Sequence, residues 1–153
     1  MNRRALLKRT LAVSAVSVAA SAGLLVPGQV LAAYPKSAFE SKAVDSSLSS
    51  LMGSSAMEES GNIKIKAPDI AENGSVVPVT VSTKITNVES ITILAEANGT
   101  PLVASFDVSG AQGYVSTRIK MGKTGNVIAV VKSGGKMYTG KKEVKVTIGG
   151  CGG

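Results

Sequence analysis

The stretch Val127-Ile128-Ala129-Val130-Val131 decides the fold of this chain, because it is an unbroken apolar run enclosed by turn signals. Lys123-Thr124-Gly125 stands before it and Ser133-Gly134-Gly135 stands after it. Glycine-containing clusters of this kind separate strands. A short apolar run without a polar position is typical of a strand that is buried on both faces. The sequence therefore predicts a strand that other parts of the protein cover from two sides.

Around this run, apolar and polar residues alternate along short segments between residues 63 and 148. Alternation with a period of two is the pattern of strands with one buried face. The alternating positions are Ile63 and Ile65; Val77, Val79 and Val81; Ile91, Ile93 and Ala95; Leu102, Ala104 and Phe106; Val115, Thr117 and Ile119; and Val144, Val146 and Ile148. About seven short strands in this region fit an immunoglobulin-like β-sandwich, so the predicted fold class is mainly β.

One of these segments contains a proline, Pro78. Proline has no amide hydrogen to donate to a neighbouring strand, so we expect an edge or a bulge at this point. Exposed edge strands invite pairing with another chain. The sandwich is therefore a candidate for a stable complex with a second protein.

Residues 35–53 predict one short amphipathic helix before the sandwich. Pro35 and Ser37 provide start signals, and Gly53 provides a stop signal. The apolar stripe consists of Val44, Leu48 and Leu51, with Phe39 and Ala43 one turn earlier on a neighbouring stripe. A single amphipathic helix cannot bury its own apolar stripe. It must pack on the following sandwich or on a partner, and the sequence leaves both open. Residues 54–62 predict a linker.

Residues 1–33 have the order of an export signal. Four basic residues, Arg3, Arg4, Lys8 and Arg9, precede a mildly apolar stretch. Small residues then allow cleavage after Ala32 or Ala33. The alternative interpretation is a membrane anchor. It is disfavoured because the apolar stretch is short and is followed by Pro27-Gly28 and the cleavage pattern.

The stretch Asn2-Arg3-Arg4-Ala5-Leu6-Leu7-Lys8 resembles a twin-arginine export signal, with Arg3 and Arg4 as the paired arginines. Such a signal implies export of a folded protein to the periplasm, without a membrane anchor after cleavage. Folded export is useful when a chain must first acquire a cofactor or a partner in the cytoplasm. No cofactor site is visible in the sequence, so co-export with a bound partner is the hypothesis.

The composition excludes several functions. The chain has 17 basic and 10 acidic residues, a net charge of +7. Removing the four basic residues of the signal leaves 13 against 10, or +3, with Arg118 as the one remaining arginine. Nucleic-acid binding therefore loses its support. The sequence has no histidine and one cysteine. This excludes histidine-dependent catalysis, histidine-ligated metals and an internal disulfide. We therefore predict no catalytic residues, no metal and no cofactor.

The cysteine stands in the run Gly149-Gly150-Cys151-Gly152-Gly153, directly after the last predicted strand. Glycines on both sides give little steric bulk, so the thiol of Cys151 could enter a narrow cleft of another protein. No base lies nearby in the sequence, so activation is left to whatever binds the tail. The functional interpretation is covalent attachment of a substrate to Cys151. The alternative is a free thiol that forms disulfide-linked dimers on oxidation.

These features together resemble the SoxY family of sulfur-carrier subunits. The resemblance is carried by the twin-arginine start, the short helix, the glycine-flanked Cys151 and one longer stretch. That stretch is Lys66-Ala67-Pro68-Asp69-Ile70-Ala71-Glu72-Asn73-Gly74-Ser75-Val76-Val77-Pro78-Val79.

The resemblance implies that Cys151 carries sulfur intermediates of thiosulfate oxidation and that the chain is not an enzyme. It implies a heterodimer with a SoxZ-like subunit. A SoxAX-like cytochrome would couple thiosulfate to the thiol, and a SoxB-like hydrolase with a dimanganese site would release sulfate. A SoxCD-like sulfane dehydrogenase would oxidise the remaining sulfur in some organisms. The other function class that the sequence leaves open is an exported structural or adhesive module cross-linked through Cys151.

The sequence thus divides into four parts. Residues 1–33 are the predicted twin-arginine signal peptide, and residues 34–62 are the predicted helix and linker. Residues 63–148 are the predicted sandwich. Residues 149–153 are the predicted flexible carrier tail, with Gly149, Gly150, Gly152 and Gly153 around Cys151.

Overall fold

The computed structural model describes residues 34–148, so the predicted signal peptide and the predicted tail lie outside the described residues. The described helices are α2 (Lys36–Glu40) and α3 (Val44–Met52). The described strands are β1 (Glu58–Glu59), β2 (Ile63–Lys66), β3 (Ile70–Ala71), β4 (Val77–Thr83), β5 (Val88–Ala95), β6 (Leu102–Asp107), β7 (Tyr114–Ile119), β8 (Gly125–Ser133) and β9 (Lys136–Val146).

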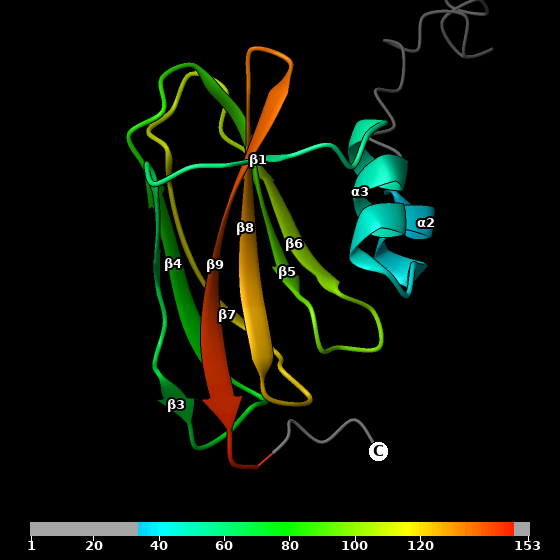
Figure 1. Cartoon of the computed structure of the whole chain (residues 1–153), viewed down its shortest axis with the longest axis vertical. Helices are drawn as coiled ribbons and strands as arrows, with labels where there is room; N and C mark the ends of the chain where they lie inside the picture. Colours follow the sequence, from blue (N-terminus) through cyan, green and yellow to red (C-terminus); the bar gives the residue numbers. More distant parts are fainter. Residues whose placement is uncertain (1–33, 149–153) are drawn as a thin grey trace, which may run out of the picture. The chain divides into compact units, whose positions relative to one another are not determined.

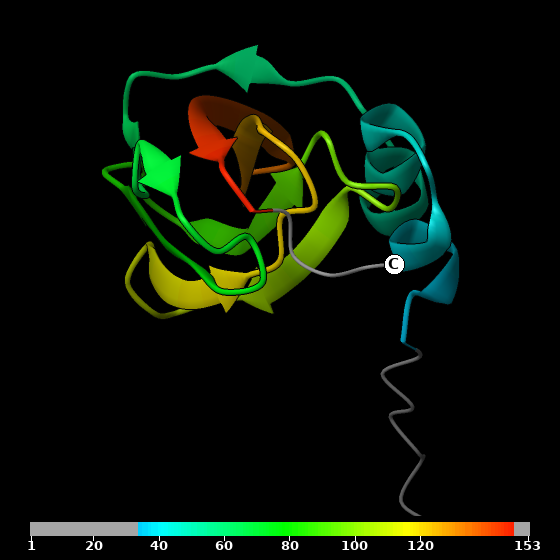
Figure 2. The same cartoon turned by 90° about the horizontal axis from the view of Figure 1, so that it is seen from below.

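Within residues 34–148 the strands form two sheets that face each other (Figures 1 and 2). The larger sheet has the order β1-β9-β8-β5-β6, and β3 also pairs with β9. The smaller sheet has the order β2-β4-β7. The short strands β1 and β3 run parallel to β9, while the longer strands pair antiparallel. The predicted mainly β, immunoglobulin-like sandwich is confirmed.

The space between the sheets is filled by the alternating residues that the sequence pattern identified. From the smaller sheet, Val77, Val79 and Val81 of β4 are at most 1% exposed. From the larger sheet, they meet the inward-facing side chains of β5 and β8, which are Ile91, Ile93, Ala95, Val127, Ala129 and Val131. Because successive side chains of a strand point to opposite faces, the other residues of β5 and β8 must face outward.

Those outward residues form a second apolar cluster beneath the helices. Leu94 of β5 and Val130 of β8 belong to it, together with Ala38 of α2 and Leu48 of α3. All four side chains have 0% exposure. The helices thus cover the outer face of the larger sheet (Figure 2). This explains the unbroken apolar run of β8, and it shows that the helical segment packs on its own sandwich.

The helical segment differs from prediction in being divided. Between α2 and α3, Ser41 and Ala43 have extended backbone, with ψ of 141° and 148°. The Ser41 hydroxyl donates to the carbonyl oxygen of Ser37 at 2.7 Å, a local bond that competes with helical pairing. The break lets Ala38 and Leu48 both reach the sheet. The predicted stop is confirmed, since Gly53 has a φ of 77° and its amide donates to Ser49.

Two short strands were not anticipated from the sequence. β1 lies within the predicted linker and pairs with Tyr138 and Thr139 of β9. β3 pairs with the other end of β9. Each has only two residues, which is too short to show a period of two. Both are strands because they pair with the backbone of β9, which lies far away in the sequence.

Pro78 lies on the middle strand of the smaller sheet, yet it occupies a local edge. β2 ends at Lys66, opposite Thr80, so no strand continues beside Pro78 on that side. The amide of Thr83 points the other way, to Gly113 before β7. By alternation along β4, the nitrogen of Pro78 faces the unpaired side. Its missing hydrogen therefore costs no hydrogen bond.

Burial of Leu48 gives a test of the helix packing. Replacing Leu48 with alanine should lower the free energy of unfolding by about 2–5 kcal/mol, because it leaves a cavity against the outer face of the larger sheet. Urea denaturation followed by circular dichroism measures this change. Ser49→Ala is the matched control, since Ser49 is an exposed neighbour on α3. Equal midpoints for the two variants would contradict the packing described here.

Candidate functional site

The structure describes the part of the sandwich to which the sequence-predicted site residues are attached, but not those residues themselves. Cys151, its flanking glycines and the paired arginines Arg3 and Arg4 lie outside the described residues. What is described is the platform from which residues 149–153 leave the sandwich. We call this platform the tail base and define it as residues 69–74, Thr124 and residues 145–148.

The backbone of residues 69–74 holds the end of β9. Ile70 and Ala71 of β3 lie opposite Lys145 and Val146 in parallel register. The amide of Lys145 donates to Asp69, and the amide of Thr147 donates to Ala71, at 2.9 and 3.1 Å. These bonds lie beyond Gly125 and Val144, which are the last regular pair of β8 and β9 at this end of the sheet. The end of β9 therefore has a backbone partner after β8 has turned away.

The last described residue, Ile148, is also held. Its carbonyl oxygen accepts the amide of Gly74 at 2.9 Å. The carbonyl oxygen of Gly74 in turn accepts the amide of Met121 at 2.7 Å. Gly74, which is buried, thus connects the last described residue to the loop between β7 and β8.

Side chains add to this backbone support. The hydroxyl of Thr124 accepts the amide of Val146 at 2.9 Å. The hydroxyl of Thr147 donates to the carbonyl oxygen of Glu72 at 3.2 Å. Lys142, on the same strand, forms an ion pair with Asp69 at 3.0 Å, although Asp69 is 91% exposed. An exposed pair of this kind adds little stability, so the hydrogen bonds carry the anchoring.

The anchoring limits how far Cys151 can reach. Cys151 is the third residue after Ile148, and three extended residues span at most about 10 Å. Since the chain is hydrogen-bonded up to Ile148, the reach cannot be extended without breaking the bonds of the tail base. A protein that acts on the thiol must therefore approach the sandwich itself.

The described residues supply position rather than reactive groups. Among residues 34–148, no cluster of three or more histidine, cysteine, aspartate or glutamate side chains could hold a metal ion. The amide of Ser109 donates to the carboxylate of Asp107 and lowers its pKa. Asp107 pairs with Ser90 at the end of the larger sheet that is remote from Val144, so it is not part of the tail base. Neither helix in the described part of the chain could cross a membrane.

Sequence reasoning did not find the tail base. In the sequence, residues 72–74 belong to the stretch that carries the family resemblance and give no sign of a contact with the end of β9. In the structure they form a turn, in which the side chain of Asn73 accepts the amide of Ser75. No local pattern could show that the same residues pair with the end of β9. The pairing is visible only in three dimensions.

A family model and a half-identical solved structure identify the same family. A model of the family described as sulfur oxidation protein SoxY matches residues 48–151. Among solved structures, the sulfur carrier protein SoxY from Chlorobium limicola f thiosulfatophilum is 50% identical, with a TM-score of 0.62, over 68% of this chain and 96% of that chain. The reeler domain of human F-spondin is 15% identical, with a TM-score of 0.39, over 57% of this chain and 92% of that chain. No curated protein matches.

The fold and the tail base define an immunoglobulin-like sandwich that anchors a cysteine-bearing segment at the end of its last strand. The family match includes both the tail base and Cys151. The chain belongs to the SoxY family, which confirms the resemblance seen in the sequence.

The role of Thr124 in the tail base can be measured. Thr124→Val keeps the shape of the side chain and removes the acceptor for the amide of Val146. The loss of one hydrogen bond, about 1 kcal/mol, should speed hydrogen exchange at the end of β9 about five-fold. Amide exchange followed by NMR at Val146 and Thr147 checks this. Thr80→Val is the matched control, because the Thr80 hydroxyl bonds Ser116 on a distant strand pair. Equal exchange at β9 in both variants would contradict the anchoring.

Proposed function

We propose that the chain is a carrier of sulfur intermediates, which are bound covalently to Sγ of Cys151. The observation that carries this proposal is the family match, because it extends to Cys151 and because the half-identical structure is that of a sulfur carrier protein. The chain would act as a carrier rather than a catalyst. Its partner enzymes would perform the chemistry while the intermediate stays attached.

The proposed loading step is an oxidation. A bond forms between Sγ of Cys151 and the terminal sulfur of thiosulfate, and the thiol loses its proton. The electron pair released by this coupling passes to a SoxAX-like cytochrome. A SoxB-like hydrolase then adds water to the terminal sulfone, which leaves as sulfate, while a sulfur atom remains on the cysteine. A SoxCD-like sulfane dehydrogenase would oxidise that sulfur before a further hydrolysis.

The surroundings of Cys151 in the sequence suit a carried thiol. An ordinary cysteine has a pKa near ~8.5, so only a small fraction is thiolate at neutral pH. The tail itself supplies no base, so each enzyme would activate the thiol inside its own cleft. Gly149, Gly150, Gly152 and Gly153 add no side-chain bulk and would let a narrow cleft close around the backbone.

We further propose that the carrier is a heterodimer with a SoxZ-like subunit in the periplasm. The twin-arginine stretch at Arg3 and Arg4 supports export in the folded state. Within residues 34–148, β7 is paired on one side only, which leaves a strand edge for a partner. Folding and assembly in the cytoplasm before export would then explain the signal.

The carrier role predicts the behaviour of Cys151→Ser. This variant should keep the urea midpoint of the parent protein but lose all thiosulfate-dependent turnover with the cognate cytochrome and hydrolase. Intact mass spectrometry of the parent after incubation with thiosulfate and the cytochrome should show adducts on Cys151. Turnover that survives in Cys151→Ser would refute the proposal. Disulfide dimers without adducts would favour a cross-linked structural module instead.

The export proposal predicts a shared fate for two proteins. Replacing Arg3 and Arg4 together with lysine should remove the chain from the periplasmic fraction. If the partner travels with it, the SoxZ-like subunit should disappear from that fraction as well. Immunoblots of periplasmic and cytoplasmic fractions test both statements. A single change of Arg118 to lysine is the control. Normal export of the partner without the chain would contradict co-export.

A further inference from the structure

Apolar side chains are exposed around the point where the tail leaves the sandwich. Among the described residues, the large apolar side chains that are exposed are Tyr34, Ile70, Val76, Tyr114 and Ile148. Three of these, Ile70, Val76 and Ile148, belong to the tail base or to its next turn. We call these three residues the apolar collar. Their exposed fractions are 57%, 52% and 67%.

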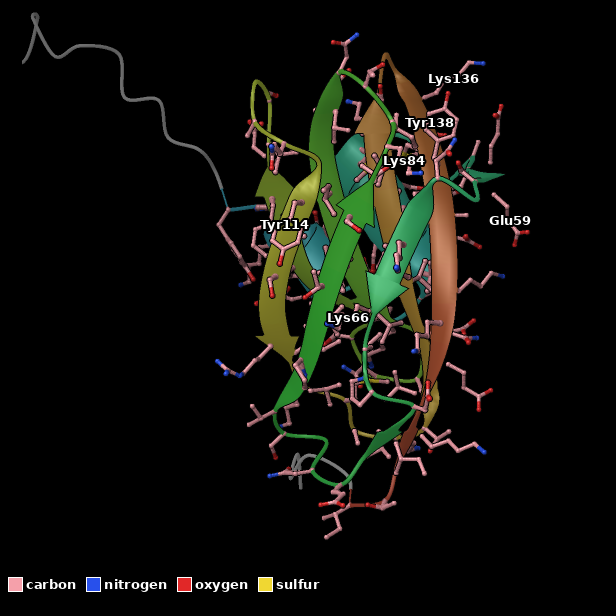
Figure 3. The ribbon with its side chains drawn as sticks, turned by 90° about the vertical axis from the view of Figure 1, so that its left-hand side faces the viewer. Glu59, Lys66, Lys84, Tyr114, Lys136 and Tyr138 are labelled. Carbon is pink, nitrogen blue, oxygen red and sulfur yellow. The ribbon has the colours of Figure 1, made fainter. Side chains whose placement is uncertain are left out.

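Backbone bonds place the three collar residues around one point. Ile70 lies opposite Lys145 in the pairing of β3 with β9. Ile148 bonds Gly74 through its carbonyl oxygen, and the amide of Val76 donates to Asn73 at 3.4 Å. In Figures 1 and 3 this end of the sandwich is the one at which β9 ends, and Tyr114 lies at the other end of β7. The three collar residues therefore lie on backbone segments that are joined to one another at the end of β9.

Single exposed apolar residues are ordinary on protein surfaces, but groups of them mark contact sites. The collar is such a group, and it stands on backbone that the tail base fixes. Charges of both signs stand nearby: Asp69 is paired to Lys142, Glu72 and Lys145 are exposed, and Lys120 and Lys123 lie on the loop that bonds Gly74. The three collar side chains themselves are uncharged, so what they offer an approaching protein is apolar contact.

The short reach of Cys151 determines what must cover the collar. The thiol lies at most about 10 Å from Ile148, which is itself held by Gly74. An enzyme that takes the thiol into a cleft must therefore bring the rim of that cleft against the tail base. Whenever the cysteine is inside an active site, the collar is beneath the rim.

We propose that the apolar collar is the docking surface for the enzymes that act on Cys151, and that their cleft entrances carry an apolar rim that packs on it. This inference rests on the proposed carrier function. Burial of the collar accompanies each insertion of the thiol and is reversed when the enzyme leaves. Successive enzymes would use the same surface, because the short tail brings the rim of each active-site cleft to the same place on the sandwich.

The test compares polar and apolar versions of the collar in the full chain with its partner subunit. Ile70→Thr with Val76→Thr keeps β-branching and removes apolar surface. It should lower kcat/KM for thiosulfate loading by the cytochrome about ten-fold, through KM. Ile70→Val with Val76→Ile is the matched control, which keeps the surface apolar and should load normally.

Reaction of Cys151 with a small disulfide reagent separates docking from damage. Its rate should be equal in all variants, because a small molecule needs no collar contact. Normal enzymatic loading of the threonine variant would overturn the collar while leaving the carrier function intact. Turnover by Cys151→Ser would refute the carrier function itself, and the inference with it. If the threonine double variant fails to fold, as judged by its urea midpoint, Val76→Thr alone gives the same comparison, and normal loading of that single variant overturns the collar.

Discussion

The structure depends on the burial of the β5 and β8 pair on both faces. A strand that is apolar at every position cannot leave either face in water, so it requires two separate covers. In this chain one cover is the smaller sheet, which contributes the valines of β4. The other is the pair of short helices, which contribute Ala38 and Leu48. Neither half of the described fold would bury its apolar surface without the other.

This constraint explains which parts of the fold could be predicted from the sequence. The run from Val127 to Val131 and the alternation of Val77, Val79 and Val81 report burial locally, so the sandwich followed from them. The helical stripe containing Leu48 was visible as well, but its cover was not, because a stripe does not identify what lies against it. The division of the helix at Ser41 coincides with a local side-chain bond that the spacing of apolar residues does not reveal.

The candidate site divides in the same way. Cys151 was found from the sequence because its neighbours are all glycine and no other cysteine is present. The tail base was not, since its bonds join backbone atoms of residues 69–74 to the end of β9. Backbone pairing of two residues with a distant strand has no side-chain signature. The part of a carrier that sets its reach is therefore harder to see in a sequence than the part that carries the substrate.

The bond between Thr147 and Glu72 joins residues that are 75 positions apart. Contacts of such long sequence separation form late in folding, because closing a long loop costs chain entropy before the contact can offset it. The end of β9 can therefore settle only after nearly the whole chain has been synthesised and its sandwich assembled. The tail base is therefore complete only in a chain that has finished folding. A chain that stalls earlier in folding would still have its thiol but would lack the firm base from which to present it.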